Sequence, residues 1–344
     1  MDAKQEKPVD LPADMIEFIL SKLPVKSLLR FKSVCKSWNT IISDPVFIRN
    51  HRHLSMFSNV QNLFLAKISL GYHNFFSLVK LEGRKFITVE KIKGPDQWNT
   101  ILCVCDGVLL LSDFWYRNFT LWNPSKRTET KFSSPIEFES RLNFGLCHNP
   151  ITGDFKAVIV YRSHYLVFST RDKDIVNVRE FDDQTTHGSS ELMNFCGVCA
   201  DGVVYWAMQR DNCTEIVYFD PRDDEFRVLE KPEYLKDDDR SFHLTIWKGF
   251  LCLYRNGEDE TRVEIWAKEK GCGNSTNNWM NVITIENVEK PISCFKPQCF
   301  VENKVLIVSK RSMSLYSPWA KTFELVDDAD LACVDVMVPF PESI

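Results

Sequence analysis

The first 54 residues have the apolar pattern of a short helical bundle. Apolar residues recur at helical spacing over residues 15–23. Pro24 ends this segment, because proline disfavours helix in the residue before it. A second apolar segment covers residues 25–31, and a third covers residues 38–42. Asp44 and Pro45 suit an N-cap and a first helical position, so they predict a fourth short helix.

Three or four short helices in about 45 residues carry more apolar surface than so small a bundle can bury. The excess surface must face another structure. One interpretation is a helical cap over the rest of the chain, and the other is a docking surface for a partner protein.

The same stretch resembles an F-box, the module by which substrate receptors bind ubiquitin ligases built on a cullin scaffold. The matching residues are Leu11-Pro12, Ile19-Leu20, Leu23-Pro24, Leu28-Leu29, Phe31 and Val34-Cys35-Lys36-Ser37-Trp38. The resemblance implies docking of a Skp-type adaptor by Leu11, Pro12, Ile19, Leu20, Leu23, Pro24, Leu28, Val34, Cys35 and Trp38.

A run of basic residues crosses this module. Lys22, Lys26, Arg30, Lys32 and Lys36 have no acidic residue between them. They form either a solvated face or a surface that steers an acidic partner, and F-box adaptors are acidic as a family. The run lacks interleaved aromatic residues and the chain has a net charge of -5, so we do not predict a nucleic-acid site.

Beyond about residue 60, the pattern changes to short apolar runs separated by turn residues. Such runs are typical of β-strands. The predicted strands include Leu63–Leu70, Phe86–Ile92, Val104–Leu111, Lys156–Tyr161, Val203–Met208, Thr245–Tyr254 and Val305–Val308.

The turns recur at an almost constant interval. Gly107, Gly153, Gly202, Gly249 and Asn303 are spaced by 46 to 54 residues. This period is typical of a β-propeller with four strands per blade. Five marked repeats and an unmarked one near residues 57–93 predict about six blades, closed by a last strand at residues 333–338. A β-sandwich with coincidental turn spacing is the alternative.

This region resembles the plant F-box-associated domain, which is kelch-like, and the chain is similar to S-locus F-box-type proteins. The matching segments are Leu121–Ser125, Asn149–Lys156, Gly202–Trp206, Val217–Pro221 and Val263–Trp266. The glycine pair of true kelch blades is absent. The predicted organisation is a flexible leader (1–9), an F-box (10–54), an all-β propeller (55–338) and a tail (339–344).

The sequence contains few signs of catalytic or metal chemistry. No nucleotide-binding, hydrolase or metalloprotease motif occurs, so we predict no enzymatic activity and no cofactor, with a cryptic hydrolase as a remote alternative. Cys196-Gly-Val-Cys199 could be half of a zinc site, but no second C-x-x-C exists. The sequence shows no apolar export signal and no run of about 18 apolar residues. We therefore predict free thiols, no membrane partner and a cytoplasmic or nuclear location.

The resemblance implies a substrate-recognition subunit of a Skp–cullin–F-box ubiquitin ligase. A stand-alone propeller that binds proteins is the alternative. Acidic clusters in predicted loops are candidates for binding a basic substrate, or are merely solvated. These residues are Asp237, Asp238, Asp239, Glu258, Asp259 and Glu260.

Overall fold

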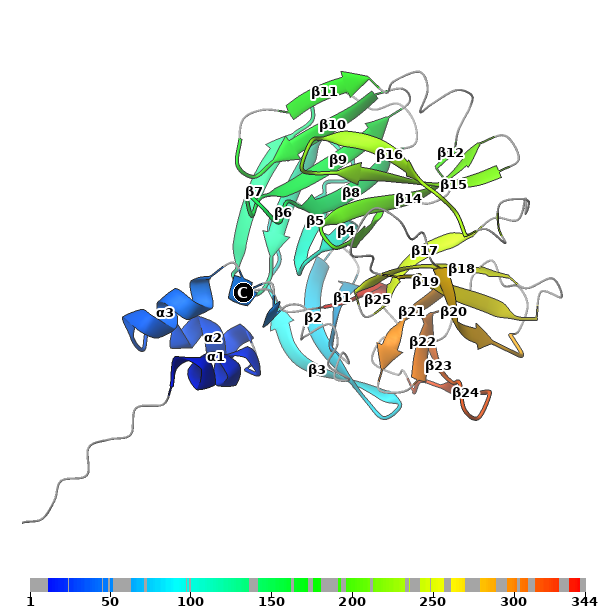
Figure 1. The fold of residues 1–344 in the computed structure, drawn as a ribbon, viewed down its shortest axis with the longest axis horizontal. Helices are drawn as coiled ribbons and strands as arrows, with labels where there is room; N and C mark the ends of the chain where they lie inside the picture. Colours follow the sequence, from blue (N-terminus) through cyan, green and yellow to red (C-terminus); the bar gives the residue numbers. More distant parts are fainter. Residues whose placement is uncertain are drawn as a thin grey trace, which may run out of the picture.

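The chain folds as a small helical module beside a closed ring of β-sheets (Figure 1). The computed structural model describes residues 12–23, 25–44, 46–48, 50–51, 63–70, 73–96, 98, 100–135, 142–161, 164–172, 176–180, 191–192, 196–210, 213–232, 235, 242–247, 249–256, 261–269, 279–288, 296–301, 304–308, 313–327 and 334–340. No helix in this part of the chain has the length and apolar character needed to span a membrane.

The helical module contains α1 (Ala13–Ser21), α2 (Val25–Phe31) and α3 (Lys36–Ser43), followed by helical residues at 46–48 and 50–51. These positions agree with the helices predicted from the apolar pattern. Pro12 is the N-cap residue of α1.

The described strands form six sheets, which are the blades of a propeller. Blade 1 contains β25 (Val334–Pro339), β1 (Leu63–Leu70), β2 (His73–Glu82) and β3 (Lys85–Ile92). Blade 2 contains β4 (Thr100–Cys105), β5 (Val108–Ser112), β6 (Asn118–Asn123) and β7 (Thr128–Ser133). Blade 3 contains β8 (Asn143–His148), β9 (Phe155–Tyr161), β10 (His164–Ser169) and β11 (Val176–Glu180).

In blade 4, β12 (Glu191–Leu192) and β13 (Val198–Ala200) both pair with β14 (Val203–Arg210), which is followed by β15 (Cys213–Asp220) and β16 (Glu225–Leu229). Blade 5 contains β17 (His243–Trp247), β18 (Phe250–Asn256), β19 (Val263–Lys268) and β20 (Trp279–Ile285). Blade 6 contains β21 (Lys296–Val301), β22 (Lys304–Val308), β23 (Met313–Ser317) and β24 (Thr322–Leu325). The prediction of a six-bladed, four-stranded propeller is therefore confirmed for the described residues.

The last strand of the chain closes the ring. β25 pairs antiparallel with β1, with Leu65 opposite Val338. Pairing the two ends of the domain removes an exposed sheet edge, as the sequence predicted. Six apolar clusters fill the spaces between neighbouring blades, one at each junction among the described residues.

Two predicted strands are instead hairpins. The run 104–111 contains the end of β4 and most of β5, and the run 245–254 contains parts of β17 and β18. In the first run, Asp106 and Gly107 have φ angles of 51° and 75°, which is typical of a tight hairpin turn. Apolar residues continue on both sides of this turn, because inner strands pack between two blades.

Four of the five marker residues occupy equivalent turns. Gly107, Gly153, Gly202 and Gly249 all have positive φ and join the first two strands of their blades. This position was predicted from their spacing. The fifth marker, Asn303, lies outside the described residues.

Candidate functional site

The helical module has an apolar core of its own. Its most deeply buried side chains are those of Leu20, Val25, Leu28, Ile42 and Phe47. Trp38 packs beside them, with its ring centroid 5.3 Å from that of Phe31. Among the described residues, no propeller side chain belongs to this core, so the module does not use the propeller to complete its interior.

Two local interactions fix the end of the module. The Asp44 carboxylate accepts hydrogen bonds from the backbone N–H groups of Val46 (2.7 Å) and Phe47 (3.1 Å), which makes it the predicted N-cap. His51 is buried, and its Nε2 lies 2.8 Å from the carbonyl oxygen of Leu23. This contact joins the end of the module to the junction between α1 and α2.

Despite this core, five large apolar side chains of the module are 45–61% exposed. They are Met15, Phe18, Ile19, Val34 and Val46. Met15, Phe18 and Ile19 share one face of α1, because residues three and four apart are neighbours on a helix. The Nζ of Lys22 lies 5.1 Å above the Phe18 ring and adds a positive charge to this face. We call the five residues the exposed apolar face.

The module contacts the propeller through α2. A cavity of about 230 Å³ lies between α2 and blades 1 and 2. It is lined by Val25, Leu29, Leu78, Glu90, Ile92, Pro124, Ser125, Arg127 and Phe340. The exposed apolar face contributes no residue to this lining, so it stays open to a partner.

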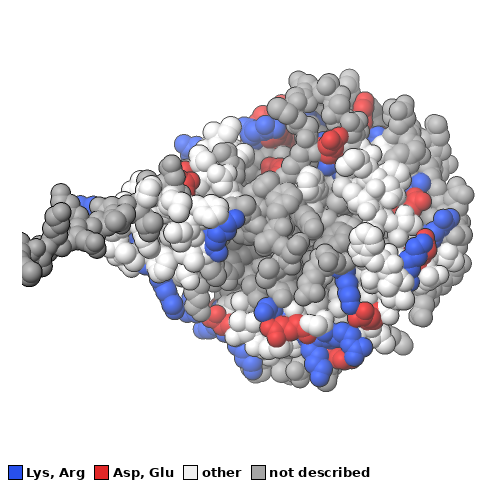
Figure 2. Space-filling model, turned by 60° about the horizontal axis from the view of Figure 1, so that its bottom comes forward, with Lys and Arg blue, Asp and Glu red and all other residues white. Residues whose placement is uncertain are grey.

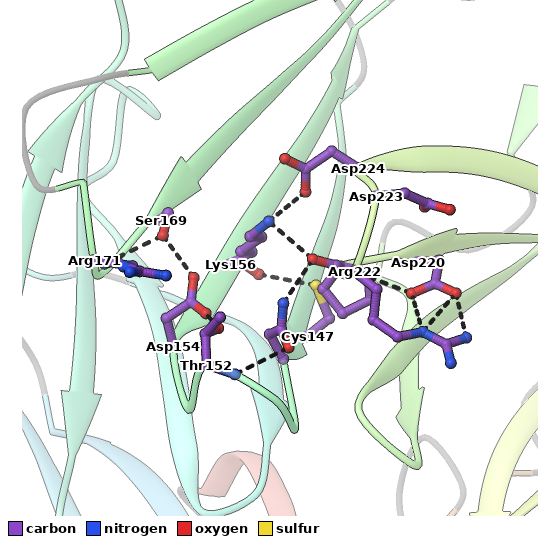
Figure 3. A network of polar contacts seen from close by, with 12 residues as sticks. Cys147, Thr152, Asp154, Lys156, Ser169, Arg171, Asp220, Arg222, Asp223 and Asp224 are labelled. Atoms are coloured by element: carbon purple, nitrogen blue, oxygen red, sulfur yellow. Dashed lines mark hydrogen bonds and ion pairs between the residues drawn. The ribbon is translucent and has the colours of Figure 1, made fainter.

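A polar cluster of the propeller joins blades 3 and 4 (Figure 3). Lys156 donates from Nζ to the carbonyl oxygen of Pro221 (2.9 Å) and to Oδ1 of Asp224 (2.5 Å). Asn149 donates from Nδ2 to the same Pro221 oxygen (3.0 Å). These groups come from the β8–β9 and β15–β16 connections and their flanks, and we call them the blade 3–4 clasp.

Further bonds within each blade hold the clasp in place. Asp154 accepts a hydrogen bond from Ser169 Oγ (2.7 Å) and another from the Thr152 hydroxyl. Asp220 is paired with Arg222, and this hydrogen-bonded partner lowers the pKa of its carboxyl. Each polar group in the clasp therefore has a partner inside the protein, which is typical of a structural junction.

Comparisons with known proteins agree with this architecture. A family model described as "F-box associated beta propeller domain" matches residues 62–313, and one described as "F-box domain" matches residues 9–50. The chain belongs to the F-box-associated β-propeller family. It is thus an F-box protein, as the resemblance of both the helical module and the propeller implied.

Two curated relatives match this chain along most of their length. An F-box/kelch-repeat protein of Arabidopsis thaliana is 25% identical and covers 90% of this chain and 88% of its own. Protein SUPPRESSOR OF NIM1 1, from the same plant, is 25% identical, with 86% of both chains covered. Another Arabidopsis F-box protein is 36% identical over 34% of this chain and 31% of its own.

Eight of the ten docking residues implied by the resemblance are described, and they fall into three groups. Pro12, Ile19, Val34 and Cys35 are exposed, Leu23 and Trp38 are half-buried, and Leu20 and Leu28 lie in the core of the F-box. Leu11 and Pro24 lie outside the described residues. The side chains of Leu20 and Leu28 are buried and cannot contact a partner, so they can affect docking only by keeping the helices of the module in place.

The sequence reasoning missed Met15, Phe18 and Val46 as exposed apolar residues. Met15 and Phe18 could have been found from their spacing with Ile19 on α1. Cys35 was found, and a hydrogen bond with the Ser37 hydroxyl at 3.1 Å lowers the pKa of its thiol. Among the cysteines whose side chains are described, Cys35 is therefore the exposed thiol suited to react.

Charged residues of the propeller are mixed in sign. Figure 2 shows basic and acidic side chains interspersed along one edge of the molecule. Several are paired, including Lys80 with Glu82 at 2.8 Å and Arg127 with Glu90 at 3.2 Å. The nominated acidic residues 237–239 and 258–260 lie outside the described residues, so their role in substrate binding stays a prediction.

An aromatic turn of the propeller was not anticipated. Phe114 and Trp115, between β5 and β6, are 67% and 72% exposed. Tyr116 stacks on Phe144 with ring centroids 5.6 Å apart. The carboxylate of Asp113 accepts hydrogen bonds from the backbone N–H groups of Arg117 (2.9 Å) and Asn118 (3.2 Å). The turn is thus held in shape while two aromatic rings face solvent.

The side chains of seven of the twelve cysteines are described, and no disulfide occurs among them. No group of three or more His, Cys, Asp or Glu side chains within the described ranges is arranged to hold a metal ion. Cys103 and Cys105 are buried in the apolar cluster between blades 2 and 3. The absence of zinc stays a prediction.

Proposed function

We propose that this protein is the substrate-recognition subunit of a Skp–cullin–F-box ubiquitin ligase. Its F-box docks a Skp-type adaptor and, through it, a cullin scaffold, and its propeller binds a protein substrate. The observation that carries this proposal is the exposed apolar face on a module that already has a complete core. Apolar side chains left exposed beside a finished core are typical of a protein interface.

The chain itself contributes no catalytic group in this proposal. It brings a substrate near a conjugating enzyme, and the rate gain comes from proximity and orientation. The family match and the two-module architecture support this role.

The adaptor interface is centred on α1. Phe18 and Ile19 are adjacent to Lys22, so an apolar contact is bordered by positive charge that favours an acidic partner. Val34 and Cys35 extend the surface toward α3. Leu20 and Leu28 keep the helices in the arrangement that presents these residues.

The test is adaptor binding by the full chain with both Phe18 and Ile19 changed to Ala. Losing two apolar anchors should cost at least about 2 kcal/mol, or roughly 30-fold in affinity. The matched control changes Ile87 and Val89 of β3 to Ala, because these side chains are also 48% and 56% exposed but lie on the propeller. Deletion of residues 1–54, or Leu23→Ala with Pro24→Ala, should also abolish binding.

Equal adaptor affinity in the F-box variant and in the control variant would overturn the ligase role. The stand-alone propeller would then be the better account of the chain. Circular dichroism of both variants should match the unmodified protein, since exposed side chains contribute little to folding.

We propose that the substrate contacts the face of the propeller that carries Phe114 and Trp115. The turn between β5 and β6 joins the second and third strands of blade 2, and β18 and β19, which flank residues 257–262, are the second and third strands of blade 5. Equivalent strand ends of a closed ring share a face. Exposed aromatic residues on a fixed turn are frequent hot spots of protein interfaces.

Substrate capture by cells expressing the full chain separates the two kinds of contact. Changing both Phe114 and Trp115 to Ala should reduce capture of substrates while adaptor binding is unchanged. Reversing residues 237–239 and 258–260 to lysine should slow association with a basic substrate and weaken its salt dependence. If neither variant changes the captured proteins identified by mass spectrometry, the substrate face lies elsewhere.

A further inference from the structure

Cysteines from separate blades meet near the axis of the propeller. Cys103 and Cys105 belong to β4, which is the inner strand of blade 2. Cys196 and Cys199 lie at the start of blade 4, and Cys147 belongs to β8 in the blade between them. The chain has no second C-x-x-C, and the partner of Cys196-Gly-Val-Cys199 is the C-x-C at residues 103–105.

Two contacts pair these thiols across the axis. The Sγ atoms of Cys105 and Cys199 are 2.6 Å apart although 94 positions separate the two residues in the chain. Cys103 is hydrogen-bonded to Cys196. β4 and β13 are also neighbouring strands in the fold.

The backbone around Cys196 and Cys199 is held firmly. Gly197 donates its N–H to the carbonyl oxygen of Phe144 at 2.7 Å, and Trp206 donates from Nε1 to the same oxygen at 3.1 Å. A Cβ at Gly197 would lie 2.5 Å from the Val204 side chain and 2.8 Å from the Trp206 ring, so only glycine fits. The thiols are thus brought together by packing that does not depend on their own bonding.

The two members of the close pair differ in access to solvent. Cys199 is half-buried, whereas Cys105 is 2% exposed. Burial is the main cause that raises the pKa of the Cys105 thiol, and its hydrogen bond with Cys199 raises this pKa further. An oxidant therefore meets Cys199 first, and Cys105 is positioned to react with the product.

We propose that Cys105 and Cys199 form a redox-sensitive disulfide, which a hydroperoxide closes and a thiol reductant reopens. The Cys199 thiolate attacks the peroxide, which yields a sulfenic acid and, for hydrogen peroxide, hydroxide that is protonated to water. The Cys105 sulfur then displaces hydroxide from Cys199, and its proton leaves with that hydroxide as water. Two thiols lose two electrons in total, and one peroxide gains them.

The bond would link the inner strands of blades 2 and 4 across the ring. Cys103 and Cys196 are placed to form a second bond by the same reaction. Closing a chain loop of this length restricts the unfolded state strongly, so the oxidised propeller should resist unfolding better than the reduced one.

The test treats the full chain with hydrogen peroxide, alkylates the remaining thiols and analyses the tryptic peptides without reduction. Trypsin releases one peptide with Cys103 and Cys105 and another with Cys196 and Cys199, because Lys93, Arg117, Arg179 and Arg210 are the flanking cleavage sites. We expect a cross-linked pair of these peptides. It should disappear on reduction, and it should persist in Cys103→Ser, which assigns the bond to Cys105.

Two variants and one internal reporter complete the design. Cys199→Ser should lose the Cys105 bond, whereas Cys252→Ser, which removes a buried thiol in contact with the Phe250 carbonyl, should keep it. Oxidation of the exposed Cys35 shows that the peroxide has reacted with the protein. The oxidised protein should also unfold a few degrees higher than oxidised Cys199→Ser.

Three results would overturn the proposal. The first is recovery of all four cysteines in alkylated form once Cys35 is oxidised. The second is a bond between Cys196 and Cys199 within one peptide, with no link to β4. The third is about one zinc per chain in the purified protein, lost in Cys199→Ser, because the thiols would then be metal ligands.

Discussion

The F-box and the blade 3–4 clasp differ in which side chains they expose and which they bury. In the F-box, apolar side chains such as Phe18 and Ile19 face solvent beside a complete core. In the clasp, polar groups such as Lys156 and Asp154 are drawn into the protein and have partners there. The F-box therefore exposes apolar side chains to solvent, whereas the polar groups of the clasp are hydrogen-bonded within the protein.

This contrast distinguishes exposed residues that are available for binding from buried residues that stabilise the fold. Two segments that resemble the F-box-associated domain, 149–156 and 217–221, supply Asn149, Lys156 and the Pro221 carbonyl of the clasp. These segments join blades and offer no open site. In these two segments, the family resemblance therefore falls on residues that join blades 3 and 4.

Gly202 gives the largest expected effect at the junction of blades 3 and 4. Its φ is 81°, and a Cβ there would lie 2.3 Å from the carbonyl oxygen of His148. Backbone strain and overpacking together should lower the free energy of unfolding by about 3–5 kcal/mol in Gly202→Ala. Urea denaturation followed by tryptophan fluorescence measures this loss.

Gly153 is the matched control for Gly202. Its φ is 74°, but nothing lies within 4 Å of a Cβ built there. Gly153→Ala should therefore cost only the conformational strain, about 1 kcal/mol. Equal losses in the two variants would mean that contact with His148 does not matter and that the junction is looser than described.

Leu20 and Phe18 test the same distinction inside the F-box. Leu20 is fully buried, so Leu20→Ala should destabilise the module by about 3 kcal/mol, whereas Phe18→Ala should change it by less than about 0.5 kcal/mol. Hydrogen exchange of the full chain can resolve the module. Amides in α1–α3 should exchange up to roughly 100-fold faster in Leu20→Ala.

Adaptor binding should give the reverse order for these two residues once the module is folded. Phe18→Ala should weaken binding directly, and Leu20→Ala should weaken it only by the fraction of modules that unfold. Leu20→Ala could instead lose adaptor binding while its hydrogen exchange is unchanged. Leu20 would then contact the adaptor, and the distinction between core and surface residues of the F-box would be wrong.

Sequence alone predicted the features that depend on local spacing. The Asp106-Gly107 and Asp201-Gly202 turns have the residue types that two positive φ angles require. The cap formed by Asp44 also depends on its immediate neighbours. Repetition of such signals at a constant interval was sufficient to predict the blade number.

Features that depend on distant contacts could not be predicted in the same way. Which face of α1 is buried depends on where α2 and α3 pack, so Leu20 and Ile19 looked equivalent. The contact between Cys105 and Cys199 arises only when blades 2, 3 and 4 pack together. The aromatic turn had a visible signal, because Phe114, Trp115 and Tyr116 are consecutive, but their exposure depends on the strands that flank them.

Lys156 gives the smallest of these effects and tests the clasp itself. In Lys156→Met, the alkyl chain is retained, but the Pro221 oxygen and the Asp224 carboxylate each lose a charged donor. Arg179, 3.7 Å from the Asp224 carboxylate, can compensate in part. We therefore expect a loss of about 2 kcal/mol in the free energy of unfolding.

The control for this last variant is Lys321→Met. Lys321 is paired with Glu286 at 3.0 Å, but its side chain is mostly exposed, so the loss should stay below about 0.5 kcal/mol. Urea midpoints at an unchanged denaturant dependence give both values. A small loss in Lys156→Met would mean that water replaces its bonds at low cost. The clasp would then be a solvated contact, and the junction would depend mainly on the apolar cluster between blades 3 and 4.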